Sequence, residues 1–166
     1  MIDGRWRSPG HEAAGVAPAT RILDRLNINT IDGFDVRAQV LAITAEHLRP
    51  SAFYKAKDTV RDGAFRRLAQ RADLELLVRF GRADCHGRGG TFDCSAMDWF
   101  LERARALGVE HAPPAPLLLG RHLLALGVTP GPRMGEILRA IYDKQLDGTV
   151  TTVDEAVTEA RHLVTG

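Results

Sequence analysis

The chain has 166 residues and a net charge of +1, with 45% hydrophobic and 26% charged residues. This balance is typical of one globular domain, or of two small ones, and not of a disordered protein. No apolar run approaches the roughly 20 residues of a membrane helix, and no signal peptide is visible, so no membrane contact is expected. Two cysteines, Cys85 and Cys94, do not make a disulfide framework, which favours a cytoplasmic location.

Helical periodicity runs along the chain, and no sustained alternation of apolar and polar residues predicts a strand. Loops are expected at Asn27–Gly33, around Lys55 and Lys57, at Gly87–Gly90 and at the Pro-rich residues 111–116. The predicted helices are residues 11–26, 35–48, 58–71, 73–86, 95–107, 119–126, 133–146 and 153–164. The expected fold is therefore all-α, a multi-helix array.

Local signals define several helix ends. Arg49–Pro50 should end the second helix, because the residue before proline disfavours helical geometry. Thr129 is expected to cap the helix that begins near Arg133. Thr152 and Glu155 have the spacing of a capping box for the last helix. The chain is predicted to divide into a helical domain over residues 1–90 and a C-terminal helical module over residues 91–166.

Basic residues concentrate in the middle of the chain, where residues 49–88 hold ten Arg or Lys and five Asp or Glu. Lys55, Lys57 and Arg88 are candidates for contact with a phosphate backbone. Three further arginines extend the set: Arg66, Arg67 and Arg71. Phe53 and Trp6 are candidates for stacking on bases. The alternative interpretation is an arginine-rich face that only meets solvent.

The segment from Thr129 to Gly135 predicts a turn between two helices. The backbone amides at Gly131, Arg133 and Gly135 would face solvent at the positive end of a helix, which suits a phosphate group. Such a hairpin can hold a sugar-phosphate chain without reading bases. The alternative is an ordinary helical hairpin that only packs.

His11, His47 and Asp84 form a second candidate set, because imidazole and carboxylate groups are common ligands of catalytic metals. Their spacing matches no local ligand motif. The alternative is that each is a satisfied residue of the core. Cys85, His86 and Cys94 lack the paired spacing of a zinc site.

Several segments, in order, resemble one family. Residues 4–15, 46–50 and 82–88 resemble parts of the HD domain of bacterial tRNA nucleotidyltransferases, the last as an Ala-Asp-x-x-Gly-Arg signature. Residues 117–148, with Gly-Val-Thr-Pro-Gly-Pro, resemble the C-terminal module of CCA-adding enzymes and bacterial poly(A) polymerases.

The resemblance implies a truncated HD-like domain followed by an RNA-binding module, with tRNA or another RNA 3′ end as the partner. The family's catalytic head, with its Gly-Ser motif and paired carboxylates, has no counterpart in this sequence, so no catalytic residue is expected here. His11 and His47 match histidines of the HD metal site, and a divalent metal is implied only for the parent enzyme.

Two other functions remain open. One is a remnant HD-type phosphohydrolase that would use a metal held by His11, His47 and Asp84 to activate water. The other is a non-catalytic helical interaction protein.

Overall fold

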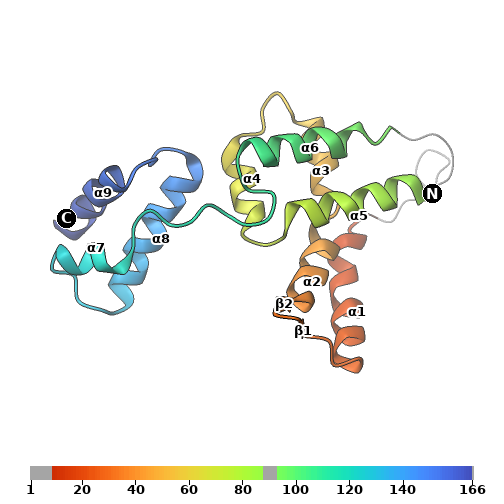
Figure 1. The fold of residues 1–166 in the computed structure, drawn as a ribbon, viewed down its shortest axis with the longest axis horizontal. Coiled ribbons are helices and arrows are strands. Elements are labelled where there is room, and N and C mark those ends of the chain that lie inside the picture. The colour runs from red at the N-terminus through yellow and green to blue at the C-terminus, as the bar shows by residue number, and fades with distance from the viewer. Residues whose placement is uncertain (1–8, 88–92, 166) are drawn as a thin grey trace. The chain divides into compact units, whose positions relative to one another are not determined.

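The computed structural model describes residues 9–87 and 93–165. It is mostly α-helical, which confirms the predicted fold class, and Figure 1 shows the arrangement of the helices within each part of the chain. The helices are α1 His11–Arg25, α2 Val36–Glu46, α3 Arg49–Lys55, α4 Asp62–Ala69, α5 Leu74–Gly87, α6 Ser95–Ala106, α7 Gly120–Ala125, α8 Pro132–Asp147 and α9 Val153–Thr165.

The contacts divide the chain into two compact units. The first unit comprises the described residues up to 60 together with residues 68–112, and the second comprises residues 61–67 and 113–165. The division therefore falls at the Pro-rich segment. This division describes packing alone, and the domain boundary predicted between residues 90 and 91 stays a prediction.

The core of the first unit lies where α5 packs against α6 and α3 packs against α6. Its apolar residues recur at helical spacing along α5 and α6, so that one apolar face of each helix is buried in the core. The fully buried members are Leu74, Leu77, Val78, Phe100 and Ala104. The ring of Phe53 lies 5.7 Å from that of Phe100, which places α3 on the same core.

A short β-hairpin replaces the loop predicted at Asn27–Gly33. Strand β1, Thr30–Ile31, pairs antiparallel with β2, Phe34–Asp35. The turn residues Asp32 and Gly33 both have positive φ, 49° and 81°, which is the conformation that Asp-Gly favours in a two-residue hairpin. Strands of two residues are too short to show an alternating pattern, so periodicity could not reveal them.

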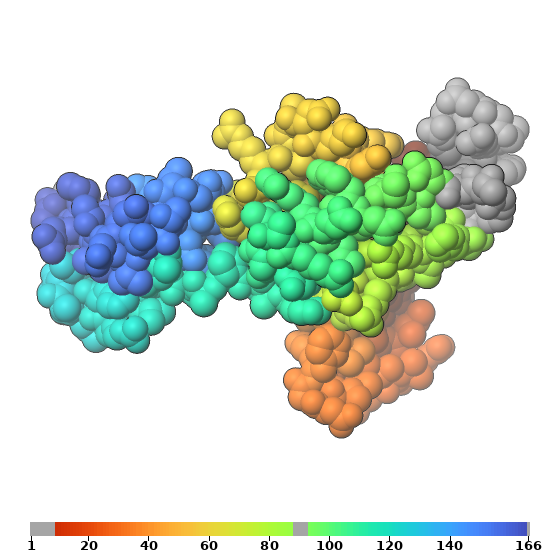
Figure 2. Space-filling model, turned by 45° about the horizontal axis from the view of Figure 1, so that its top comes forward, coloured from red at the N-terminus to blue at the C-terminus, as the bar shows by residue number. Residues whose placement is uncertain are grey.

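The hairpin belongs to an arm in which α1 packs against α2. Within the first unit, Figures 1 and 2 show β1, β2 and α2, in orange, standing out from α5 and α6. Ile22, Leu26, Ile31 and Phe34 are exposed there. The arm is therefore thinly packed compared with the α5–α6 core.

The sequence signal at Arg49–Pro50 marks a helix start and not only an end. Helix α2 ends at Glu46, and α3 begins at Arg49 with Pro50 in its first turn. Proline is tolerated there because the first-turn amides have no helical acceptor. The expectation that Lys55 lies in a loop is therefore wrong, since Lys55 is the last residue of α3.

Cys85 and Cys94 form a disulfide bond with their Cα atoms 6.2 Å apart, so the expectation of two unpaired cysteines is wrong. The bond joins the last turn of α5 to the residue that precedes α6. The packing of α5 against α6 brings the two residues together, and sequence spacing does not report this. The bond removes the argument for a reducing compartment.

The second unit has a core of its own between α7, α8 and α9. Apolar residues from each helix, and from the segments that flank them, meet in it. They are Leu118, Leu123, Ile137, Ile141, Val150, Ala156 and Ala160. This core positions the hairpin of α7 and α8, which carries the candidate phosphate contacts.

No helix among residues 9–87 and 93–165 is long and apolar enough to cross a membrane.

Candidate nucleic-acid interface

The turn after α7 is closed by backbone hydrogen bonds. Gly127 has φ 81°, its amide donates to the carbonyl of Leu124, and the Val128 amide donates to that of Leu123. This left-handed glycine ends the helix in the manner of a Schellman motif. Val128 then packs against the core of the second unit, which fixes the direction of the chain toward α8.

Helix α8 begins without a side-chain cap. Gly131 occupies the N-cap position and makes no side-chain hydrogen bond, so the expectation that Thr129 caps this helix is wrong. Pro132 follows as the first helical residue and has no amide hydrogen. The two-residue Pro-Gly interval places the helix start beyond the reach of the Thr129 hydroxyl.

Three amides at this end remain available. Those of Gly131, Arg133 and Met134 have no acceptor among the described residues, whereas the Gly135 amide donates to the Gly131 carbonyl at 3.4 Å. The amides stand at the positive end of a 16-residue helix. The arrangement suits an anionic oxygen.

Arg133, the arginine nearest the start of α8, already has partners for its side chain. Arg133 Nη2 donates to the carbonyl of Leu163 at 2.7 Å, and Nη1 lies 3.6 Å from Glu136 Oε2. The guanidinium therefore bonds a backbone carbonyl near the end of α9 and is also close to a carboxylate. The backbone amide of Arg133 is more available to a ligand than its side-chain charge.

Two other arginines carry unshared charge. Arg121 and Arg139 are exposed and make no hydrogen bond or ion pair with the described residues. The Arg139 guanidinium lies against Gly135, where a Cβ would be 3.4 Å from its Nη1. Sequence reasoning missed both, although the four-residue spacing of Gly135 and Arg139 on a helix was a usable signal.

The basic candidates of the first unit are partly available. Lys55 and Lys57 are exposed, and Lys57 Nζ lies 5.2 Å from the centre of the Tyr54 ring. Phe53 contacts Phe100 of the core, so its ring is already partly used in packing. Arg88 and Trp6 lie outside the described residues.

The three additional arginines do not form a free phosphate track. Arg66 Nη1 donates to the Leu146 carbonyl at 3.0 Å, and Arg67 Nη2 lies 2.7 Å from Asp147 Oδ1. Arg71 Nε lies 2.9 Å from Glu46 Oε1. Each of these guanidinium groups is therefore already bonded to a group of its own unit.

The candidate metal residues are brought partly together. His11 Nε2 and His47 Nε2 lie 2.9 Å apart, and His47 Nδ1 lies 2.9 Å from the Thr44 carbonyl. A carbonyl only accepts, so Nδ1 of His47 carries a hydrogen, and a neutral His47 accepts at Nε2 from His11. His47 and Asp84 also line one pocket of about 90 Å³.

This donor set is chemically suited to a transition metal. However, the described part of the chain contains no group of three His, Cys, Asp or Glu side chains placed to hold an ion. The two histidines and Asp84 stay a predicted site.

The chain is similar to an A-adding tRNA nucleotidyltransferase. This curated protein, from Deinococcus radiodurans, is 32% identical over 158 residues. The alignment takes in 92% of the chain and 35% of the relative, so the chain spans about a third of the relative's length. No family model and no solved structure matches the chain.

The similarity covers both units and agrees with the family that the sequence motifs resemble. It supports a protein related to tRNA nucleotidyltransferases.

Proposed function

We propose that this chain is the tRNA- or RNA-binding helical portion of a tRNA nucleotidyltransferase or poly(A) polymerase-like protein. It would hold the RNA while a nucleotidyltransferase head, whose Gly-Ser motif and paired carboxylates this sequence lacks, adds nucleotides. The similarity to an A-adding tRNA nucleotidyltransferase supports this partner and this class of reaction.

The observation that carries the proposal is the uncapped start of α8. The same helix carries the unpaired guanidinium of Arg139, which lies against Gly135, and the Glu136 carboxylate lies 3.6 Å from Arg133. Backbone amides and arginine bind phosphate oxygens regardless of base identity, as a protein that holds many tRNAs requires.

The direct test is binding of tRNA to the full chain by fluorescence anisotropy at several salt concentrations. The logarithm of the association constant should fall linearly with the logarithm of salt concentration. Arg121→Ala with Arg139→Ala should weaken binding and reduce the slope. Arg21→Ala with Arg25→Ala, two exposed arginines of the first unit, is the control for loss of two charges. Binding no tighter than that of a neutral control protein would instead favour a non-catalytic interaction protein.

The assignment of Lys55 and Lys57 to the interface has its own test. Lys55→Glu with Lys57→Glu should weaken tRNA binding, because both ammonium groups are exposed. Unchanged affinity would remove these two residues from the interface and leave the α8 assignment standing.

A metal-dependent phosphohydrolase is the second candidate, favoured by the contact of His11 with His47 and by the pocket that His47 shares with Asp84. Metal bound to the purified chain, lost in His11→Ala and in His47→Ala, together with hydrolysis of a generic phosphodiester, would support it. A chain that binds no transition metal and has no turnover would exclude it.

A cytoplasmic location also remains part of the proposal.

A further inference from the structure

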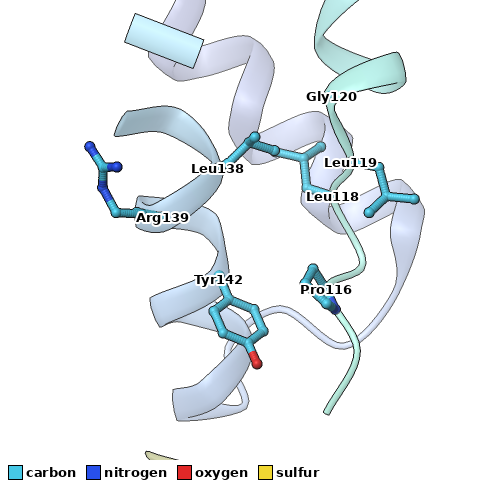
Figure 3. Close-up of a pocket in the computed structure, with 7 residues that line it drawn as sticks. All are labelled: Pro116, Leu118, Leu119, Gly120, Leu138, Arg139 and Tyr142. Carbon is cyan, nitrogen blue, oxygen red and sulfur yellow. The ribbon is translucent and has the colours of Figure 1, made fainter. Parts of the chain in front are cut away.

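The second unit contains an apolar pocket of about 260 Å³ that the sequence motifs do not explain. It lies between α8 and the segment that leads into α7, and Figure 3 shows its walls. Its lining residues are Pro116, Leu118, Leu119, Gly120, Leu138, Arg139 and Tyr142. The volume is below the roughly 300–1,000 Å³ of pockets for drug-sized ligands, and it suits one small flat group.

Hydrogen bonds hold one wall of the pocket in place. Tyr142 Oη donates to the Pro114 carbonyl at 2.8 Å. Gln145 Nε2 donates to the Ala115 carbonyl at 2.8 Å, and its Oε1 accepts from the Leu117 amide at 3.0 Å. Leu118 is 3% exposed and belongs to the core. The pocket is therefore formed before any ligand arrives, which lowers the entropic cost of binding.

The pocket presents rings and not polar groups. Tyr142 and Pro116 project from opposite walls toward the gap, as Figure 3 shows. The Tyr142 hydroxyl is already used in its bond to Pro114, so the remaining surface is the ring. Flat aromatic heterocycles stack on such surfaces, and every nucleobase has a suitable face.

The charge at the rim points to the kind of ligand. Arg139 is the charged member of the lining, and none of the seven residues is acidic. Its side chain is directed away from the gap in Figure 3 and lies against Gly135, in the first turns of α8. An apolar side chain from another protein would fill the gap but make no use of this cation. A nucleotide matches both features, with its base inside and its phosphate outside.

We infer that this pocket binds one unstacked nucleobase of an RNA strand, with the phosphate of that nucleotide on Arg139. The inference rests on the proposed function and adds to it a base-stacking subsite next to the phosphate contacts of α8. It explains why an apolar pocket and an unpaired arginine lie side by side on one helix.

The test uses NMR on the full chain, with AMP as the probe and ribose 5-phosphate as the base-free control. AMP should shift the ring signals of Tyr142 and the methyl signals of Leu118 and Leu138. Ribose 5-phosphate should shift signals near Arg139 only. No AMP-induced shift at millimolar concentration would overturn the inference, as would equal shifts produced by N-acetyl-leucine amide.

Matched variants separate stacking from folding. Tyr142→Leu should weaken AMP binding roughly 5-fold or more, the lower range for loss of one stacked base. Tyr142→Phe keeps the ring but loses the bond to Pro114, so it should bind AMP more tightly than Tyr142→Leu does. Equal affinity of Tyr142→Leu and the unmodified chain would contradict the inference.

RNA binding distinguishes this inference from the proposed function. If tRNA binds the unmodified chain and Tyr142→Leu equally, the subsite is wrong and the proposed function stands. If AMP shifts the Tyr142 ring but tRNA does not bind, the pocket is a nucleotide site and the proposed function is wrong.

Discussion

Gly81 of α5 lies directly against Met97 of α6, so closely that a Cβ on Gly81 would be 2.6 Å from the Met97 sulfur. Met97 is 4% exposed and Gly81 is buried, so neither has room to move toward solvent. The absence of a side chain at Gly81 thus sets how closely α5 approaches α6 in the core of the first unit.

Gly81→Ala should therefore destabilise the chain. Overpacking of a core costs about 1–3 kcal/mol, and the better helix propensity of alanine offsets up to about 1 kcal/mol of that. Gly87→Ala is the matched control, because a Cβ there has nothing within 4 Å. Urea denaturation measures both. Gly81→Ala as stable as Gly87→Ala would show that Met97 moves aside without cost.

The disulfide should contribute to stability through the ring that it closes. Cys85 and Cys94 are nine positions apart, and closing a ring of that size removes on the order of 2–3 kcal/mol of unfolded-state entropy. Cys85→Ser with Cys94→Ser should lower the free energy of unfolding by about this amount.

Reductant provides the control for this prediction. Dithiothreitol should lower the stability of the unmodified chain to that of the double variant, and should leave the variant unchanged. Two thiols that titrate in the native, untreated protein would contradict the pairing.

The sequence predicts features that depend on neighbours along the chain. The capping box of Thr152 and Glu155 is confirmed, since the Thr152 amide donates to Glu155 Oε2 and the Glu155 amide donates to Thr152 Oγ1. Gly148, with φ 79°, ends α8 in the left-handed conformation that glycine adopts easily. Both signals are complete within a few residues, so they can be read without knowledge of the fold.

Features that depend on tertiary packing were not predictable in this way. The pairing of Cys85 with Cys94 requires that α5 and α6 lie together. The contact of His11 with His47 joins residues 36 positions apart. The position of Arg139 at the rim of a pocket depends on Pro116 and Tyr142, which line the same pocket. In each case the partner is set by how helices dock, which periodicity alone does not specify.

Stability should depend on pH through Glu155. Hydrogen bonds, first from the Thr151 amide, hold the pKa of Glu155 below its usual value of 4.5. A lowered pKa in the folded state means that the ionised carboxylate stabilises the fold. This contribution is complete above about pH 4.5 and is lost as the pH falls through the lowered folded pKa.

Glu155→Gln removes this titration while keeping an acceptor for the amides. The variant should be less stable than the unmodified chain at neutral pH, and the difference should shrink as the pH falls below the usual pKa. Thermal unfolding at a series of pH values measures it. A difference that stays constant between neutral and acidic pH would contradict the role of Glu155.

The Pro-rich segment before α7 should depend on Gln145 for its position. The Gln145 side chain bonds both the Ala115 carbonyl and the Leu117 amide, and thereby fastens the segment to α8. Gln145→Leu leaves these two backbone groups without their partner. The exposed Ala115 carbonyl can bond water instead, whereas the part-buried Leu117 amide costs about 1–3 kcal/mol if it stays out of water, and less if the segment moves out to water.

Hydrogen exchange distinguishes these two responses. If the segment moves, the Leu117 amide should exchange faster in Gln145→Leu, and the affinity for AMP should fall because the wall of the pocket is no longer fixed. Gln145→Glu is the control, since its carboxylate still accepts from the Leu117 amide but no longer donates to Ala115. It should therefore protect the Leu117 amide better than Gln145→Leu does. Equal protection of this amide in all three proteins would show that the segment is held by its proline residues and the apolar core.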